Sequence, residues 1–233
     1  SKEDKYTFAL NELSGYVGQN EINKIEAYDI SHLYQDHAVA SCVVFGKNGA
    51  NKDQYRLFNI PKKIAGNDTG SLEHALSRRL KYYEDHSIKP NLLLIDGGKT
   101  QLKFAQNIIN DSLHKDIKVI SIVKGLNRIR ATETILSIDG IVEIDKNSKA
   151  YLLLQEIRDE AHRFAISAQR KKKIRSVNKS FLDEIEGVGP ITKSKLFKKF
   201  KSLKNIKLSS LEELMTISGI SEKIANQILT HKE

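Results

Sequence analysis

The chain has 233 residues, and 38 Lys and Arg against 29 Asp and Glu give it a formal net charge of +9. This length allows one large or two modest domains, and the charge favours a polyanionic partner over a small neutral substrate. One cysteine, no secretory signal and no apolar run of membrane-spanning length exclude a disulfide framework and a membrane partner, so we expect a cytoplasmic protein without a cysteine-based zinc site.

The first half of the chain predicts a mixed sheet. Residues 1–20 are polar with one short helical stretch, and we expect them to form a lead-in segment. Three strand-like runs follow at 25–30, 38–45 and 54–60, and the turn sequence at 46–49 favours an antiparallel hairpin between the last two. The elements expected next are a helix at 69–85, an all-apolar buried strand at 92–95, a helix at 99–109 and a strand at 117–123.

A second hairpin and a long helix complete this region. Asp139-Gly140 is a turn signal between strand-like runs at 134–138 and 141–144. The helix begins near Ser148, with an inner apolar stripe of Leu153, Leu154, Ile157, Ala161, Phe164, Ala165 and Ala168. Three antiparallel strands, then helix, strand, helix and strand, then a closing helix is the element order of the ribonuclease H fold. We therefore predict an α/β domain over 21–172, a mixed sheet flanked by helices.

The C-terminal part repeats internally. A basic run at 170–175 predicts a linker over 173–180, and 181–233 then reads as a small all-α domain. Within it, the similar segments 185–190 and 217–222 start 32 residues apart, each between short helical patterns. The repeat indicates two copies of one helical unit.

Each repeated segment contains a glycine turn before a helix. A Gly-apolar-Gly turn at a helix N-terminus exposes backbone N–H groups that can bind a phosphate. Gly187, Val188 and Gly189 fit this pattern. The second copy has Gly219 but carries Ser221 in place of the second glycine, so we predict a more structural role for it.

Lysines crowd around the first turn, which favours DNA backbone binding. The alternative is a helical bundle whose lysines only form a solvated face. The lysines are Lys193, Lys195, Lys198, Lys199, Lys201, Lys204 and Lys207.

A carboxylate follows each of two apolar strand-like runs. Asp29 follows residues 25–28, and Asp96 follows 92–95 and precedes Gly97-Gly98. Open α/β sheets place their chemistry at the carboxyl ends of such strands. Because Mg²⁺ and Mn²⁺ prefer oxygen ligands, two acids on a basic chain predict a metal-dependent reaction on a phosphate backbone.

His162 is the candidate third ligand. It lies next to the inner stripe of the closing helix, so it can face the sheet edge, and imidazole is a good ligand for Mn²⁺. Asp29 and Asp96 are 67 residues apart in the sequence, yet the predicted fold places them on neighbouring strands.

Each of these residues also has a plainer interpretation. Asp29 fits a turn acid at a strand end, Asp96 fits a cap of the following helix, and His162 fits a hydrogen-bonded edge residue. Asp68, with Thr69, fits the N-cap of the helix at 69–85. The joint pattern favours the metal site.

Gly98-Lys99-Thr100 is not a nucleotide-binding P-loop. That motif requires a glycine five positions before Gly98, where this chain has Leu93. Lys99 is then either a phosphate contact beside the site or a solvated lysine.

Three motifs resemble the C-terminal half of the UvrC family, the nuclease subunits of bacterial nucleotide excision repair. They are Ala27-Tyr28-Asp29-Ile30-Ser31-His32, Leu94-Ile95-Asp96-Gly97-Gly98-Lys99 with Gln101-Leu102, and residues 158–166. The resemblance runs from about residue 20 to the C-terminus. It implies a ribonuclease H-like endonuclease domain followed by a tandem helix-hairpin-helix domain.

The resemblance also implies roles for particular residues. Asp29, Asp96 and His162 correspond to the catalytic, metal-binding set, and Asp68 matches a further acidic position. Arg163, beside His162, is expected to contact DNA.

The implied reaction is an incision 5′ to a lesion in double-stranded damaged DNA, with Mg²⁺ or Mn²⁺ as cofactor. The family's 3′ incision belongs to a GIY-YIG domain, which we do not recognise here, and its UvrB-contacting segment precedes this region, with UvrA acting upstream. The chain begins with Ser1 rather than Met, so we expect a piece of a longer protein.

Two other functions are compatible with the sequence. One is a DNA-binding module without catalysis, in which the acids are structural. The other is a nuclease of the same fold that prefers RNA or branched DNA, although no feature of the sequence reads a 2′-hydroxyl.

Overall fold

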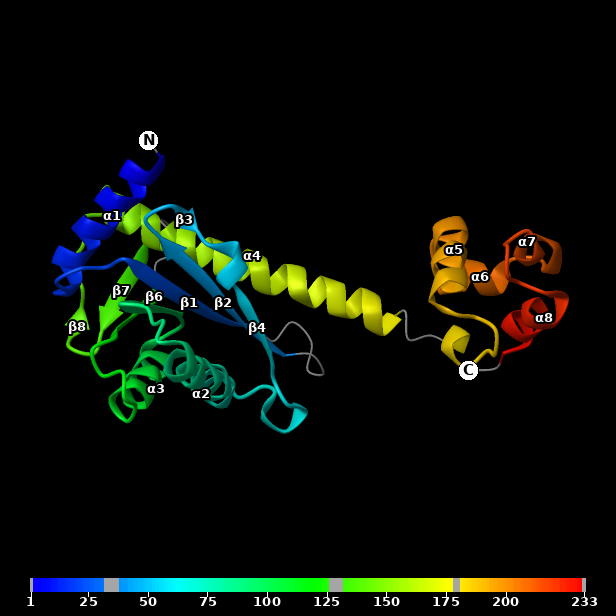
Figure 1. Ribbon diagram of the computed structural model, residues 1–233, viewed down its shortest axis with the longest axis horizontal. Helices are drawn as coiled ribbons and strands as arrows, with labels where there is room; N and C mark the ends of the chain where they lie inside the picture. The colour runs from blue at the N-terminus through cyan, green and yellow to red at the C-terminus, as the bar shows by residue number, and fades with distance from the viewer. Residues whose placement is uncertain (1, 32–37, 126–131, 178–180, 232–233) are drawn as a thin grey trace. The chain divides into compact units, whose positions relative to one another are not determined.

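A computed structural model of the chain describes residues 2–31, 38–125, 132–177 and 181–231 (Figure 1). It contains two compact units, Ser1–Arg170 and Lys171–Glu233. None of the helices in these described stretches is both long enough and apolar enough to cross a membrane.

The first unit is built on a mixed sheet, as predicted. The sheet order is β3-β2-β1-β5-β6-β7-β8, with β4 paired to β2. The pairs β1–β5 and β5–β6 are parallel, and the other pairs are antiparallel. The strands are β1 (Lys24–Ser31), β2 (Val39–Gly46), β3 (Gly49–Ala50), β4 (Arg56–Asn59), β5 (Leu92–Asp96), β6 (Lys118–Lys124), β7 (Glu133–Ser137) and β8 (Gly140–Ile141).

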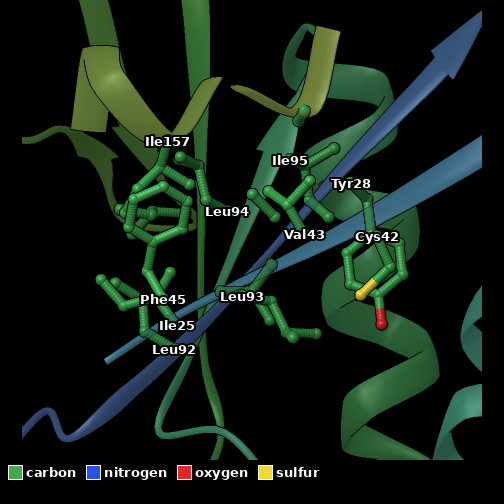
Figure 2. Close-up of a cluster of buried hydrophobic side chains, with 14 of the residues drawn as sticks. Ile25, Tyr28, Cys42, Val43, Phe45, Leu92, Leu93, Leu94, Ile95 and Ile157 are labelled. Atoms are coloured by element: carbon green, nitrogen blue, oxygen red, sulfur yellow. The ribbon is translucent and has the colours of Figure 1, made fainter. Parts of the chain in front are cut away.

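Helices cover both faces of this sheet. In Figure 1, α2 (Asp68–His86) and α3 (Lys99–Asn110) lie on one side, and α1 (Lys2–Val17) and α4 (Lys149–Val177) on the other. The apolar run of β5 is buried throughout because both of its faces are covered. Figure 2 shows Leu94 close to Ile157 of α4, with Tyr28 and Cys42 on the other side of the strands.

The lead-in expected at residues 1–20 is a packed helix instead. Tyr6, Leu10, Leu13 and Val17 of α1 are buried in the same core as the sheet. Their spacing places them on one helical face, a pattern that the polar composition of the segment obscures. The hydroxyl of Tyr6 also donates to Glu156 of α4 at 2.5 Å.

The closing helix α4 begins at Lys149 and continues to Val177. The predicted stripe is buried along it, except for Phe164, which is partly buried. Residues 173–177, which we expected in the linker, are therefore helical. Short 3₁₀ turns at Lys52–Gln54 (η1) and Lys62–Ile64 (η2) complete the first unit.

A buried ion pair connects α2 to β1. Arg79 donates through Nε and Nη2 to the carboxylate of Glu26 at 3.0 and 2.6 Å, and the Tyr83 hydroxyl donates to the same carboxylate. Burial alone would raise the pKa of Glu26, but the hydrogen bonds and charge of Arg79, with Tyr83, outweigh it and hold that pKa below its usual range. The pair therefore stays ionised inside the protein.

The second unit is a small helical domain with its own core. It comprises η3 (Phe181–Asp183), α5 (Pro190–Phe200), α6 (Leu203–Leu208), α7 (Leu211–Met215) and α8 (Glu222–Thr230). Its buried residues are Leu182, Ile185, Val188, Leu196, Ile206, Leu214, Ile217, Ile220, Ala225 and Ile228.

The 32-residue repeat is visible in the packing of this unit. A Cβ on Gly187 would lie 2.8 Å from Ile224 of α8, and one on Gly219 would lie 3.2 Å from Thr192 of α5. Each contact becomes the other when 32 is added to one residue number and subtracted from the other. Each glycine turn thus packs against the helix that follows the other turn.

Candidate metal centre

Two aspartates meet at one edge of the sheet. Asp29 on β1 and Asp96, the last residue of β5, are Cα partners in the parallel register of these strands. Parallel strands bring their carboxyl ends to the same edge, so residues far apart in the sequence become neighbours. The strand register therefore places one carboxylate beside the other.

The third member of the group comes from α4. The Nδ1 atom of His162 lies 3.1 Å from Oδ2 of Asp29. One ligand atom from each of Asp29, Asp96 and His162 can be chosen so that all three lie within 4.8 Å of one another. This is the geometry of side chains that can share a single cation, and the oxygen-rich donor set suits Mg²⁺ or Mn²⁺.

The environment of the group is partly buried and acidic. The side chain of Asp29 is only 9% exposed, whereas that of His162 is 57% exposed. Burial, and next the negative charge of Asp29, raise the pKa of Asp96 to about 6, although Arg158, His162 and Lys124 oppose the shift. Two carboxylates held so close favour a bound cation, which would remove their repulsion.

The group opens into a hollow of about 380 Å³. Lys124, at the end of β6, and Arg158, one turn before His162, add positive charge to its wall. Arg158 is paired with Glu133 and with Asp159, and its side chain is 15% exposed. The hollow thus combines a candidate cation site with cationic side chains suited to an anionic substrate.

The structure contradicts two of the plainer interpretations. Helix α3 is capped by Gly98, so Asp96 is not its N-cap. Helix α2 is capped by Asn67, whose side chain accepts from the N–H of Gly70, so Asp68 is not its N-cap either.

Asp68 lies outside the Asp29–Asp96–His162 group. It is the exposed first residue of α2, and its Oδ2 accepts a hydrogen bond from Nε2 of Gln101 at 3.2 Å. A direct ligand role for Asp68 is therefore not part of the geometry.

Two predicted DNA contacts are placed differently from each other. Lys99 is exposed at the start of α3, next to the Gly97-Gly98 turn. Arg163 donates through Nε and Nη2 to Glu160 at 2.6 and 2.7 Å, and lines a separate hollow with Lys52 and Glu156. Its guanidinium is already engaged by a carboxylate.

Four residues near the site escaped the sequence reading: Lys124, Glu133, Gln101 and, as a residue in its own right, Arg158. Only Lys124 carries a local signal, because it ends an apolar strand next to the one that Asp96 ends. The others act through contacts that only the fold creates.

The two glycine turns of the second unit share their backbone but differ in capping. Gly187 and Gly219 both have positive φ, +91° and +99°, a region that favours glycine. Gly189 caps α5 without a side-chain hydrogen bond, whereas the Ser221 hydroxyl accepts from the N–H of Ile224 at 3.4 Å. The first turn therefore leaves its helix N–H groups without a side-chain cap, which suits phosphate binding.

Lys193, predicted to contact DNA beside the first turn, is held by an acid. Its ammonium lies 2.5 Å from Asp183, and its side chain is 13% exposed. Lys195 and Lys198 are exposed on the same helix.

The fold and the metal centre define a class of protein, a ribonuclease H-like endonuclease domain joined to a helix-hairpin-helix pair. Residues 16–166 match the family described as the UvrC RNase H endonuclease domain, and residues 179–231 match the SAM-like helix-hairpin-helix tandem. The chain belongs to the UvrC family.

Curated relatives agree with this membership. The chain is 40% identical over 210 residues to UvrABC system protein C of Hahella chejuensis (strain KCTC 2396), which covers 89% of this chain and 34% of that protein. It is 39% identical over 212 residues to the protein of the same name from Legionella pneumophila (strain Lens), covering 90% and 34%. The chain thus spans about a third of the length of these curated relatives.

Solved structures with some similarity are endonucleases V. The chain is 12% identical to that of Streptomyces avermitilis, over 73% of this chain and 94% of that one, with a TM-score of 0.39. The Ciona intestinalis enzyme in complex with DNA matches with 13% identity over 55% of this chain and 56% of that one, with a TM-score of 0.35.

Proposed function

We propose that the chain is a divalent-metal-dependent DNA endonuclease that makes the incision 5′ to a lesion in bacterial nucleotide excision repair. The observation that carries the proposal is the meeting of Asp29, Asp96 and His162 at the sheet edge. Membership of the UvrC family supports the choice of damaged double-stranded DNA as the substrate. UvrB as partner, UvrA upstream and a cytoplasmic location belong to the same proposal.

In this proposal, Asp29, Asp96 and His162 hold one Mg²⁺ or Mn²⁺. The cation would activate a water molecule and neutralise negative charge that grows on the scissile phosphate. Asp29 is buried and hydrogen-bonded to His162, so its carboxylate is fixed before the metal arrives. Lys124 and Arg158 draw the DNA backbone towards the hollow.

The second unit supplies the grip on DNA. We propose that residues 181–233 bind the backbone without reading sequence, through the N–H groups at Gly187, Val188 and Gly189 and the exposed lysines nearby. Gly219 and Ser221 contribute less, because the serine already satisfies a helix N–H group. In this division, residues 21–172 cut and residues 173–180 join the two functions.

Nicking of duplex DNA with a single lesion, with and without loaded UvrB, tests the proposal. We expect Mn²⁺- or Mg²⁺-dependent nicking, and Asp96→Asn should lower the rate at least about a hundredfold, as for lost charge stabilisation at a reacting centre. Asp111→Asn is the matched control, because Asp111 is an exposed acid just after α3. Wild-type rates in Asp96→Asn, or no metal-dependent nicking of either substrate, would overturn the proposal.

The same assay separates the rival functions. A non-catalytic DNA-binding module would bind the duplex equally well in wild type and Asp96→Asn and cut it in neither. A nuclease for RNA or branched DNA would be inhibited more strongly by those competitors than by damaged duplex.

A further inference from the structure

A single amide side chain connects the turn behind Asp96 to the start of α2. The N–H of Gly98 donates to Oε1 of Gln101 at 3.0 Å, and Nε2 of Gln101 donates to Oδ2 of Asp68 at 3.2 Å. Gln101 thus lies between an exposed acid and the backbone two residues after Asp96. Its amide oxygen and its amide nitrogen are both used.

Gln101 is also packed against the turn itself. A Cβ on Gly97 would lie 3.1 Å from Cβ of Gln101, so the absence of a side chain at Gly97 makes room for this contact. On its other side, the N–H of Gly97 donates to the carbonyl of Ile122 on β6 at 3.4 Å. The Gly97-Gly98 turn is therefore held between β6 and Gln101.

This turn controls where Asp96 points. Asp96 is the last residue of β5, and the chain leaves the strand through Gly97 and Gly98. Glycines have a wide choice of backbone angles, so a turn of two glycines needs outside contacts to hold one conformation. Gln101 provides such contacts, and they act on the backbone directly after the carboxylate.

We propose that Gln101 is a positioning residue of the metal centre and that Asp68 acts on the reaction through Gln101 rather than as a metal ligand. This inference rests on the proposed function. An amide can present either its oxygen or its nitrogen to a neighbour, and the Asp68 carboxylate accepts only from nitrogen. Asp68 therefore turns the amide so that its oxygen faces Gly98.

The chemistry of the relay selects the test variants. Gln101→Glu keeps an acceptor for the Gly98 N–H but loses the donor to Asp68 and places two carboxylates face to face. Asp68→Asn keeps an acceptor for Gln101, whereas Asp68→Ala removes it. Gln106→Ala is the matched control, because Gln106 lies on the same helix and bonds Asn110 one turn away.

The measurements are Mn²⁺ affinity by calorimetry, kcat and KM for nicking, and Tm. Residues that orient metal ligands typically change affinity or activity by about 10- to 100-fold. We expect Asp68→Ala, Gln101→Ala and Gln101→Glu to weaken Mn²⁺ binding and lower kcat in that range, with little change in KM. Asp68→Asn should recover most of the loss, and Gln106→Ala should match wild type.

The double variant Asp68→Ala/Gln101→Ala decides the matter. If Asp68 acts through Gln101, the double variant is no worse than the weaker single variant. Multiplying effects, or an Asp68→Asn protein as impaired as Asp68→Ala, would overturn the inference. A purely structural role would lower Tm in Gln101→Ala while Gln101→Glu, which keeps the helix cap, bound Mn²⁺ normally, and this too would overturn it.

Asp96→Asn separates this inference from the proposed function. If Asp96→Asn abolishes Mn²⁺ binding while the double variant shows independent effects, only the relay fails. If Asp96→Asn binds Mn²⁺ as tightly as wild type, the metal centre fails and the relay with it.

Discussion

The two units assemble their candidate sites in opposite ways. The metal centre combines residues 29, 96 and 162, which come from two strands and a helix. Each glycine turn of the second unit is contained in six consecutive residues, and a single glycine with positive φ shapes it. The first site therefore depends on long-range register, and the second depends on local backbone conformation.

This difference changes what a mutation can damage. In the first unit, a residue distant from the metal centre can disturb it by shifting a strand or helix. In the second unit, the damaging positions are the glycines themselves and the atoms that they touch. Four experiments would break or sharpen this comparison.

The largest effect is expected from Arg79→Ala. The variant leaves the carboxylate of Glu26 buried without its cation, and breaking a buried pair in this way costs about 3–5 kcal/mol. Thermal unfolding should show a large loss for the first unit, with the transition of the second unit unchanged because it has a separate core. Arg78→Ala, at an exposed position on the same helix, is the control and should leave both transitions in place.

The pH dependence of the same pair has a definite sign. The pKa of Glu26 is lower in the folded protein than in the unfolded chain, so the pair stabilises the fold above the unfolded pKa. That contribution is lost as the pH falls through the folded pKa. If acid destabilised wild type and Arg79→Ala equally, the ion pair would not be the source of the stability.

The second effect compares two glycines of one turn. Gly187→Ala forces a side chain into a positive-φ position and against Ile224, so we expect a loss of about 1–3 kcal/mol in the second unit. Gly189→Ala is the matched control, because its φ is −80° and a Cβ there meets no atom within 4 Å. Denaturant unfolding of the two variants measures the difference, and equal stability would refute the local view of this turn.

Gly189→Ala has a further use. Because its stability should match wild type, any loss of duplex affinity reports on the approach of a phosphate to the backbone of this turn. Unchanged affinity would place the DNA contact elsewhere on the second unit.

The third effect is a titration of the metal centre. The pKa of Asp96 is raised to about 6, and a proton competes with a cation for the same carboxylate. Mn²⁺ affinity should be nearly constant above that pH and fall about tenfold per pH unit below it. Calorimetry between pH 5 and 8, an interval of roughly one charge change on Asp96, checks this. An affinity that is flat throughout would show that Asp96 is not a ligand.

The sequence predicted those parts of the fold that depend on local pattern. The mixed sheet and the helical second unit are confirmed, because apolar runs and glycine turns mark them along the chain. It predicted that Asp29, Asp96 and His162 would converge, and the structure brings them together; their catalytic role stays a prediction. The topology of the fold was needed for this, since nothing local connects residue 29 with residue 162.

Other features are decided by side-chain contacts that no pattern announces. The acid that neutralises Arg163 is only three residues away, yet four-residue and three-residue pairs are so common on helices that they carry no specific signal. Asp68 is joined to Gln101 across 33 residues. Helix α1 was missed because its buried face is interleaved with charged residues.

The smallest effect is expected at the cap of the second glycine turn. Ser221→Ala removes the hydroxyl that accepts from the N–H of Ile224, and loss of such a cap costs about 1 kcal/mol. Ser218→Ala, at an exposed position before the turn, is the control. Since Ser221 already satisfies this helix terminus, its loss should lower stability while changing duplex affinity little. A variant that instead bound DNA much more weakly at unchanged stability would show that the two turns contact DNA alike, and the asymmetry between them would disappear.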